Sequence, residues 1–213
     1  MRSIFNFNAK WAFSKMATEI PTAIDKKWDF VNLPHSWNAI DGQDGGNDYF
    51  RGTAYYAKTL DKLDLPQADR YYLEINGANS SAEVYLNGKK LASHDGGYST
   101  FRVDITDTLE RENLFVIAVD NAANDRVYPQ VADFTFYGGL YRDVNIICVA
   151  DSHFDLEYYG GPGIAVTPEI DGSNAKVKIE TFITNKKDSQ SIKYTVTDKE
   201  GNVVATDCGD NIW

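Results

Sequence analysis

Short runs in which apolar and polar residues alternate recur along this chain about every ten to fifteen residues, with turn residues between them. Alternation with a period of two predicts β-strands that bury one face. The clearest hairpin signal is Asn87-Gly88, which separates residues 83–86 from residues 89–92, because a tight turn needs positive φ and both residues tolerate it. No apolar stripe with a helical period is visible, so we expect an all-β chain built from antiparallel sheets.

The strand pattern predicts two domains, residues 1–151 and residues 152–213. The alternation of apolar residues up to Cys148 ends in the small polar residues around Asp151, which places the boundary there. The second domain resembles an immunoglobulin-like sandwich, which needs about seven strands and about 100 residues. Only about 60 residues remain, so we expect this second sandwich to be partial. The predicted strands are residues 54–59, 70–75, 82–86, 98–103, 113–119, 141–148 and 154–159, then 164–170, 176–184, 192–197 and 203–205.

The charge balance excludes some partners. The chain has 21 basic and 31 acidic residues, a net charge of -10, which repels a nucleic-acid backbone and an anionic membrane surface. The longest apolar run, residues 114–119, is far too short to cross a membrane. The two cysteines, Cys148 and Cys208, lie far apart in sequence and we expect both to be free thiols.

No catalytic or metal-binding motif stands out. Glycoside hydrolysis uses two carboxylates that flank the sugar ring, and no such pair occurs in a cleft-forming context. The acidic stretch at residues 41–48 lacks the glutamate that closes a calcium loop, so a solvated loop is favoured over a metal site. The histidines, His35, His94 and His153, have no nucleophile or metal-ligand spacing and are interpreted as structural. We therefore expect no metal and no cofactor.

The tryptophans have two possible roles. Amphipathic rings can stack on the apolar face of a sugar, but core packing is the favoured role for Trp11, Trp28 and Trp37. Residues 28–33 alternate like a half-buried strand, so Trp28 is expected to point inward.

Five stretches, in this order, resemble the amino-terminal region of family 2 glycoside hydrolases. They are residues 5–13 (FNFNAKWAF), 28–37 (WDFVNLPHSW), 82–88 (AEVYLNG) with 94–98 (HDGGY), 113–121 (NLFVIAVDN) and 133–144 (DFTFYGGLYRDV). The resemblance implies a jelly-roll-type, sugar-binding sandwich over residues 1–151, followed by the start of the family's immunoglobulin-like domain. It also implies that the catalytic glutamates lie in a following barrel, so this segment alone is expected to be inactive.

The resemblance also implies which residues contact sugar. Asp133 matches an acidic residue that contacts sugar hydroxyls in β-galactosidases and β-glucuronidases. A carboxylate can accept two hydroxyl hydrogen bonds with charge-assisted strength, which suits that role. The alternative role of Asp133 is structural: its carboxylate would hold the backbone of the turn that follows it. Asn47 and Asp48 match a second sugar-contacting loop less closely, because the spacing departs from the family pattern.

Three functions remain open at this point. The first is the non-catalytic part of an enzyme that hydrolyses terminal β-linked sugars with retention, galactose being the expected sugar; its partners would be carbohydrate and the catalytic barrel of its own parent chain. The second is a stand-alone carbohydrate-binding module, and the third is a structural spacer. The partial second sandwich favours the first function. A homo-oligomer is also possible, because strands that alternate toward missing partners leave apolar surface to cover.

Overall fold

The computed structural model describes residues 2–38, 49–132 and 135–209, and it divides the chain into two compact units. Unit 1 is Met1–Ala150 and unit 2 is Asp151–Trp213. The described residues are almost entirely β-structure, as the alternation predicts. Their only helical elements are two 3-10 turns, η1 (Lys62–Asp64) and η2 (Thr106–Thr108). None of the described helices has the length and apolar character needed to span a membrane.

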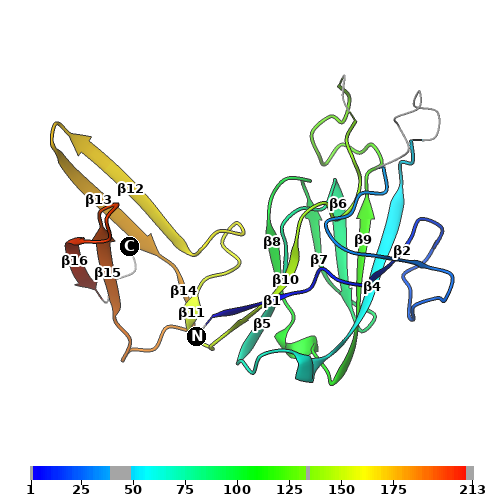
Figure 1. The fold of residues 1–213 in the computed structure, drawn as a ribbon, viewed down its shortest axis with the longest axis horizontal. Helices are drawn as coiled ribbons and strands as arrows, with labels where there is room; N and C mark the ends of the chain where they lie inside the picture. The colour runs from blue at the N-terminus through cyan, green and yellow to red at the C-terminus, as the bar shows by residue number, and fades with distance from the viewer. Residues whose placement is uncertain (1, 39–48, 133–134, 210–213) are drawn as a thin grey trace. The chain divides into compact units, whose positions relative to one another are not determined.

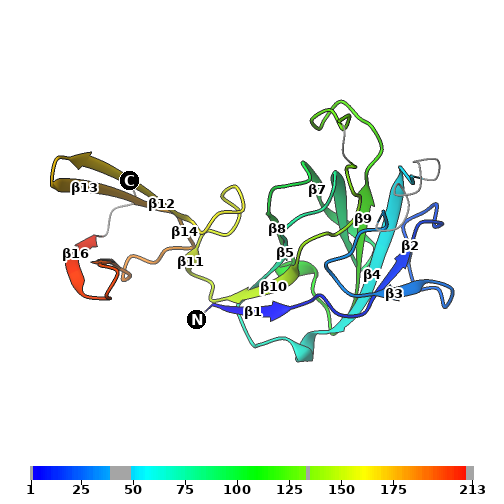
Figure 2. The same ribbon diagram turned by 45° about the horizontal axis from the view of Figure 1, so that its top comes forward.

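Unit 1 is a sandwich of two antiparallel sheets (Figure 1). The six-stranded sheet has the order β3-β2-β4-β9-β6-β7, with bounds Trp11–Ser14 (β2), Asp29–Val31 (β3), Thr53–Asp61 (β4), Ser81–Leu86 (β6), Lys89–Asp95 (β7) and Glu112–Asp120 (β9). The four-stranded sheet has the order β1-β10-β5-β8, with bounds Ser3–Asn6 (β1), Arg70–Ile75 (β5), Phe101–Asp104 (β8) and Val144–Val149 (β10). Figure 2 shows the two sheets as separate layers.

The predicted hairpin and most of the predicted strands are present. Asn87 and Gly88 have φ of 53° and 80° and join β6 to β7. Four strand predictions are wrong in extent. Residues 98–100 belong to the loop before β8, and residues 141–143 precede β10. Residues 155–159 form no strand, so that β11 covers only His153–Phe154, and the last strand continues beyond residue 205 to Gly209. The alternation also did not isolate β1, β2 and β3, because strands of three or four residues offer too few positions to establish a period.

The core of unit 1 lies between the two sheets. In β4, Ala54 and Tyr56 are fully buried and belong to this core, whereas Tyr55 and Ala57 point to the other face of the sheet. The large side chains Trp11 and Trp37 are buried in the core, which confirms the packing role predicted for both. Burial of rings of this size is a major source of stability for a sandwich.

Trp28 does not lie where the alternation placed it. It precedes β3, and it packs on the outer face of the six-stranded sheet against the small cluster that includes Tyr55 and Ala57. Ile20 and Ile24, from the segment between β2 and β3, contact the same cluster. The prediction that Trp28 points into the main core is therefore wrong, because a connecting segment supplies a second apolar surface that the strand pattern does not show.

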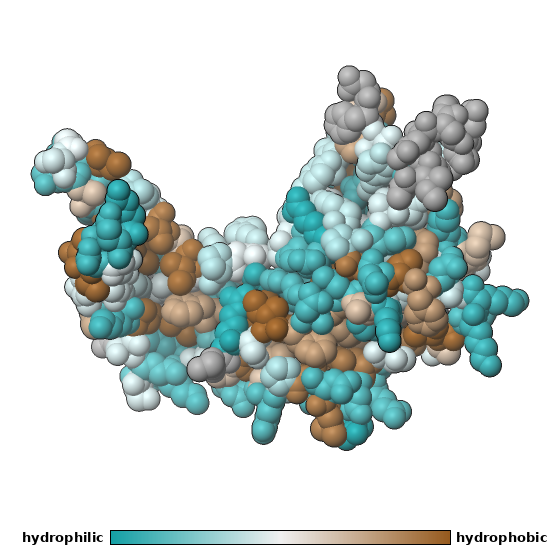
Figure 3. Space-filling model, in the orientation of Figure 1, coloured by the Kyte–Doolittle hydropathy of each residue, from teal (hydrophilic) through white to brown (hydrophobic). Residues whose placement is uncertain are grey.

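Unit 2 consists of paired strands without a second full layer among the described residues. It contains the hairpins β12–β13 and β15–β16 and the short pair β11–β14, with bounds Ile164–Asp171 (β12), Asn174–Thr181 (β13), Ile183–Thr184 (β14), Ile192–Thr197 (β15) and Val203–Gly209 (β16). Val166 and Ile170 are 58% and 79% exposed, and Figure 3 shows hydrophobic side chains interrupting the hydrophilic surface over this unit. An open groove of about 640 Å³ is lined mainly by β13, β15 and β16.

Candidate functional site

All three sugar-contacting residues predicted from the sequence, Asp133, Asn47 and Asp48, lie outside the described residues. The structure does describe the segments next to them, which begin again at residues 49 and 135. The two segments meet where the Tyr49 hydroxyl donates to the Phe136 carbonyl, in the turn at residues 136–140 that follows Asp133 in the chain. This turn is the part of the candidate site that lies within the described residues.

Buried amide side chains anchor the turn at Gly138. The Gly138 N–H donates to Asn38 Oδ1 at 2.7 Å, and the Ser36 hydroxyl donates to the Gly138 carbonyl at 2.9 Å. Asn121 Nδ2 in turn donates to Asn38 Oδ1 at 3.3 Å, and Asn38 and Asn121 are both fully buried. A Cβ on Gly138 would lie 2.1 Å from the Trp37 ring, so only glycine fits this position. The turn is therefore fixed by packing as well as by hydrogen bonds.

His35 contributes to the same anchor through Tyr56. His35 Nδ1 lies 2.8 Å from the Tyr56 hydroxyl, which also accepts from the Leu140 N–H at 3.4 Å. Burial and then the positive charge of Lys15 lower the pKa of His35, so the neutral ring is favoured. Burial raises the pKa of Tyr56, which keeps its hydroxyl protonated. The structural role predicted for His35 fits these contacts.

His94, near the end of β7, and several aromatic rings pack at the neighbouring loop between β7 and β8. His94 Nε2 lies 2.9 Å from Ser99 Oγ, and its ring stacks on Phe101 with 4.2 Å between centroids. Tyr98 stacks on Tyr128, and the Tyr128 hydroxyl donates to Asn79 Oδ1 at 3.2 Å. Asn79 Nδ2 donates to the Tyr137 carbonyl at 2.8 Å, so this loop and the turn at residues 136–140 share one network.

Sequence reasoning did not find this network. Asn121 closes the stretch of residues 113–121, but Asn38 and Asn79 carry no local motif, and the partners of all three lie 58 to 100 positions away in the chain. The available signal was the place of Asn121 directly after β9 and of Asn79 near Gly77, which describes many structural asparagines equally well. Only the folded chain distinguishes these residues from ordinary turn residues.

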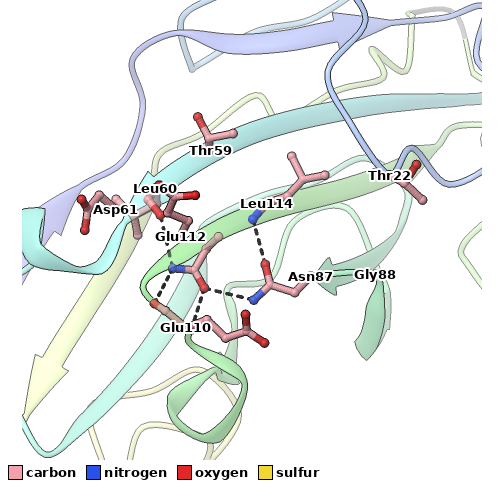
Figure 4. Close-up of a pocket in the computed structure, with 10 residues that line it drawn as sticks. Thr22, Thr59, Leu60, Asp61, Asn87, Gly88, Glu110, Glu112 and Leu114 are labelled. Atoms are coloured by element: carbon pink, nitrogen blue, oxygen red, sulfur yellow. Dashed lines mark hydrogen bonds between the residues drawn. The ribbon is translucent and has the colours of Figure 1, made fainter.

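A second candidate is a groove of about 690 Å³ at one end of β4 and β9 (Figure 4). Its carboxylates come from Asp61, Glu110 and Glu112. The two amides in its wall are already used: Asn87 Oδ1 accepts from the Leu114 N–H at 2.9 Å, and Asn113 Nδ2 donates to the Leu60 and Glu110 carbonyls. The groove is therefore built by side chains whose hydrogen bonds support the fold.

Four described carboxyl groups are poor candidates for a catalytic acid, which must hold its proton near neutral pH. Wherever a described carboxyl group has a shifted pKa, the pKa is lowered; these groups are Asp61, Glu83, Asp95 and Asp198. The main causes are a backbone N–H for Asp61 and side-chain donors for the other three: Lys90 for Glu83, Ser81 for Asp95 and Asn202 for Asp198. In the described part of the chain, no group of three or more metal-ligating side chains could hold a metal ion.

Comparison with known proteins matches both the chain and its fold. The β-glucuronidase of Faecalibacterium prausnitzii L2-6, whose crystal structure is described as FMN-binding, is 42% identical with a TM-score of 0.86, over 98% of this chain and 32% of that one. A Formosa agariphila protein named as a β-glucuronidase is 33% identical over 94% of this chain and 24% of its own length. The β-galactosidase of Thermoanaerobacter pseudethanolicus is 28% identical over 96% of this chain and 28% of its own length.

These matches extend across both units, although the chain spans only about a quarter to a third of the length of these relatives. The family model described as the glycosyl hydrolase 2 galactose-binding domain-like family matches residues 48–135, which lie within unit 1. The chain therefore carries the galactose-binding-like domain of glycoside hydrolase family 2 and belongs to that family.

Proposed function

We propose that this chain is the non-catalytic, sugar-contacting part of a retaining glycoside hydrolase that acts on terminal β-linked sugars. The observation that carries the proposal is the continuous match of 94 to 98% of the chain to family 2 enzymes. The lowered pKa values of Asp61, Glu83 and Asp95 make these three carboxyl groups unsuited to act as the catalytic acid. The catalytic carboxylates would then come from a barrel in the parent protein.

The substrate we propose to test first is a β-glucuronide. The two relatives above at 33% and 42% identity are named as β-glucuronidases, whereas the β-galactosidase is 28% identical. A β-galactoside, the sugar expected from the sequence, is the second candidate. The jelly-roll-type domain of residues 1–151 and the partial immunoglobulin-like domain of residues 152–213 are part of the same proposal.

The proposed sugar contact is Asp133, with Asn47 and Asp48 as weaker candidates. The anchored turn at residues 136–140 supports Asp133, because a contact residue works best beside backbone that is already fixed. The test uses the product of the complete reading frame that contains this chain, assayed with 4-nitrophenyl β-glucuronide and β-galactoside. We expect Asp133→Ala to lower kcat/KM by about 30- to 900-fold, which corresponds to about 2–4 kcal/mol of transition-state binding.

Other outcomes separate the alternatives. The 213-residue chain itself should turn over neither substrate. If the isolated chain hydrolyses one and loses that activity when one of its own acidic residues is replaced, the non-catalytic assignment is wrong. If the complete product is inactive but the chain binds glycans, the binding-module alternative replaces the enzyme. Wild-type kcat/KM in Asp133→Ala would leave that residue with the turn role only.

A further inference from the structure

Tyr98 is an exposed aromatic ring that the fold holds in place. It lies in the loop between β7 and β8, and 54% of its surface is exposed. Single exposed aromatic side chains are common on protein surfaces, so exposure alone indicates nothing. The ring of Tyr98, however, lies nearly parallel to that of Tyr128, with 5.2 Å between centroids and 15° between planes. The stack covers one face of the ring and leaves the remainder accessible.

Three further contacts fix this stack. Arg142 Nη1 donates to the Tyr98 carbonyl at 3.0 Å, and the Tyr141 hydroxyl donates to the carbonyl of Gly97. The Tyr128 hydroxyl is held by Asn79 Oδ1 at 3.2 Å. A binding residue that is fixed before its ligand arrives loses less conformational entropy on binding. Fixing an exposed ring in advance is therefore useful on a surface that binds a ligand, whereas a side chain that faces only solvent gains nothing from it.

The chemistry around the ring indicates the ligand. An aromatic face binds the apolar C–H face of a pyranose ring, and the phenol edge can hydrogen-bond to hydroxyl groups. Arg142 is exposed beside Tyr98, and no carboxylate among the described residues forms an ion pair with it. Its guanidinium group can present a planar pair of donors to a carboxylate. This cation next to a fixed ring favours a sugar that carries an acidic group.

We propose that Tyr98, supported by Tyr128 and flanked by Arg142, is a stacking site for a uronic acid residue of a saccharide. The proposal rests on the carbohydrate-contacting function proposed above and adds a binding site to it that does not involve Asp133. Tyr98 supplies the apolar face, and Arg142 pairs with the carboxylate. The neutral sugar of the same shape should bind the ring without the charge contribution.

The test is an NMR titration of the complete 213-residue chain with its tyrosine rings labelled. The two probes are methyl β-glucuronide and methyl β-glucoside, which differ only in the carboxylate. We expect saturable shifts of the Tyr98 and Tyr128 ring signals with both probes, at lower concentrations for the glucuronide. Tyr98→Ala should weaken binding by about tenfold or more, because it removes the stacking face. Tyr98→Phe, which keeps that face, should retain most of the binding.

Two further variants separate the roles. Arg142→Gln should weaken binding of the glucuronide by about fivefold or more relative to its effect on the glucoside, as expected for the loss of one exposed charge contact. The ring signals of Tyr98 and Tyr128 in the unliganded variant report whether the stack itself persists. The matched control is Tyr159→Ala, which removes a tyrosine that is 90% exposed in unit 2 and should not change either titration.

Several results would overturn the proposal. One is a titration in which neither probe moves the Tyr98 and Tyr128 signals; the ring then serves as a contact for polypeptide instead. Another is equal binding to Tyr98→Ala and to the wild type. Equal affinity for the two probes in the wild type would reject the role of Arg142 and with it the choice of a uronic acid. None of these results decides the proposed enzyme function, which is judged by turnover of the complete reading-frame product and by its dependence on Asp133.

Discussion

Units 1 and 2 contain strands with the same alternating pattern but bury them to very different extents. In β9 of unit 1, Phe115, Ile117 and Val119 are fully buried. In β12 of unit 2, Val166 and Ile170 are 58% and 79% exposed. The pattern is a property of each strand, whereas burial requires a second layer to close over it. Unit 1 has that layer within its described residues, and unit 2 has hairpins whose apolar faces line an open groove.

The largest expected difference between the units comes from removing a buried ring. Phe115→Ala should lower the free energy of unfolding of unit 1 by about 3–5 kcal/mol, because it leaves a cavity between the sheets. Val166→Ala in unit 2 should cost less than about 0.5 kcal/mol, because most of its side chain is already in water. Urea denaturation followed by tryptophan fluorescence, in a Trp213→Phe background, measures the first effect, since the other three tryptophans, Trp11, Trp28 and Trp37, all lie in unit 1.

Hydrogen exchange of the hairpin amides measures the Val166→Ala effect in unit 2. A large loss of protection there would show that the exposed face of β12 is covered in solution. Self-association would be one cause, and a dependence of the exchange rates on protein concentration would identify it. The contrast between the units would then be a property of the monomer only.

Ion pairs allow a second, smaller comparison. In unit 1, Arg102 Nε lies 2.7 Å from Glu74 Oε2, and both side chains are more than 90% buried. In unit 2, Lys178 Nζ lies 3.1 Å from Glu180 Oε1, with side chains that are 60% and 30% exposed. Glu74→Gln should destabilise unit 1 by about 3 kcal/mol, because it removes the negative charge that faces the buried guanidinium of Arg102. Glu180→Gln should cost about 0–1 kcal/mol.

Denaturation at low and high salt checks this difference. The Glu180→Gln effect should shrink further at 1 M salt, and the Glu74→Gln effect should persist, because a buried pair is poorly screened. If the two substitutions cost the same, the burial of the Arg102 and Glu74 pair would have no energetic consequence, and this contrast between the units would be lost.

The sequence predicted the fold well because the fold depends on local signals. Alternation located β4, β5, β6 and β9 within one or two residues, and Asn87-Gly88 located the hairpin turn by its need for positive φ. Strands as short as β3 escaped detection. Trp28 was placed wrongly because the segment between β2 and β3 creates an apolar cluster on the outer face of a sheet. A pattern that assigns one face of a strand to the core and the other to solvent cannot anticipate an apolar surface that a connecting segment adds to the outer face.

The candidate site was less predictable for a physical reason. The turn at Gly138 is held by Asn38 and Asn121, which are distant in sequence and have no period or motif of their own. The stacked pair of Tyr98 and Tyr128 also joins two separate loops. Such contacts arise from the way the sheets close, so they can be found only in the folded chain. The sugar-contacting roles of Asp133, Asn47 and Asp48 remain predictions.

The smallest expected effect concerns pH and the anchor at His35. Burial, followed by the charge of Lys15, lowers the pKa of His35 below its ordinary value of 6.5, and burial also lowers the pKa of His94. The unfolded chain therefore binds these protons more readily than the folded chain does.

The stability that the two neutral histidines contribute is fully present above pH 6.5. It is lost as the pH falls from 6.5 toward the lower pKa values of the folded chain. The lowered carboxyl pKa values, such as that of Asp95, act only below about pH 4.5, so the interval from 6.5 to 5 isolates the histidines. We expect the Tm of unit 1, followed by tryptophan fluorescence in the Trp213→Phe background, to fall across this interval. His35→Gln should reduce the slope, because glutamine does not titrate and can still hydrogen-bond to Tyr56. An unchanged slope in this variant would show that His35 is protonated without cost in the folded chain, and the anchor would then tolerate a charge that its buried surroundings should disfavour.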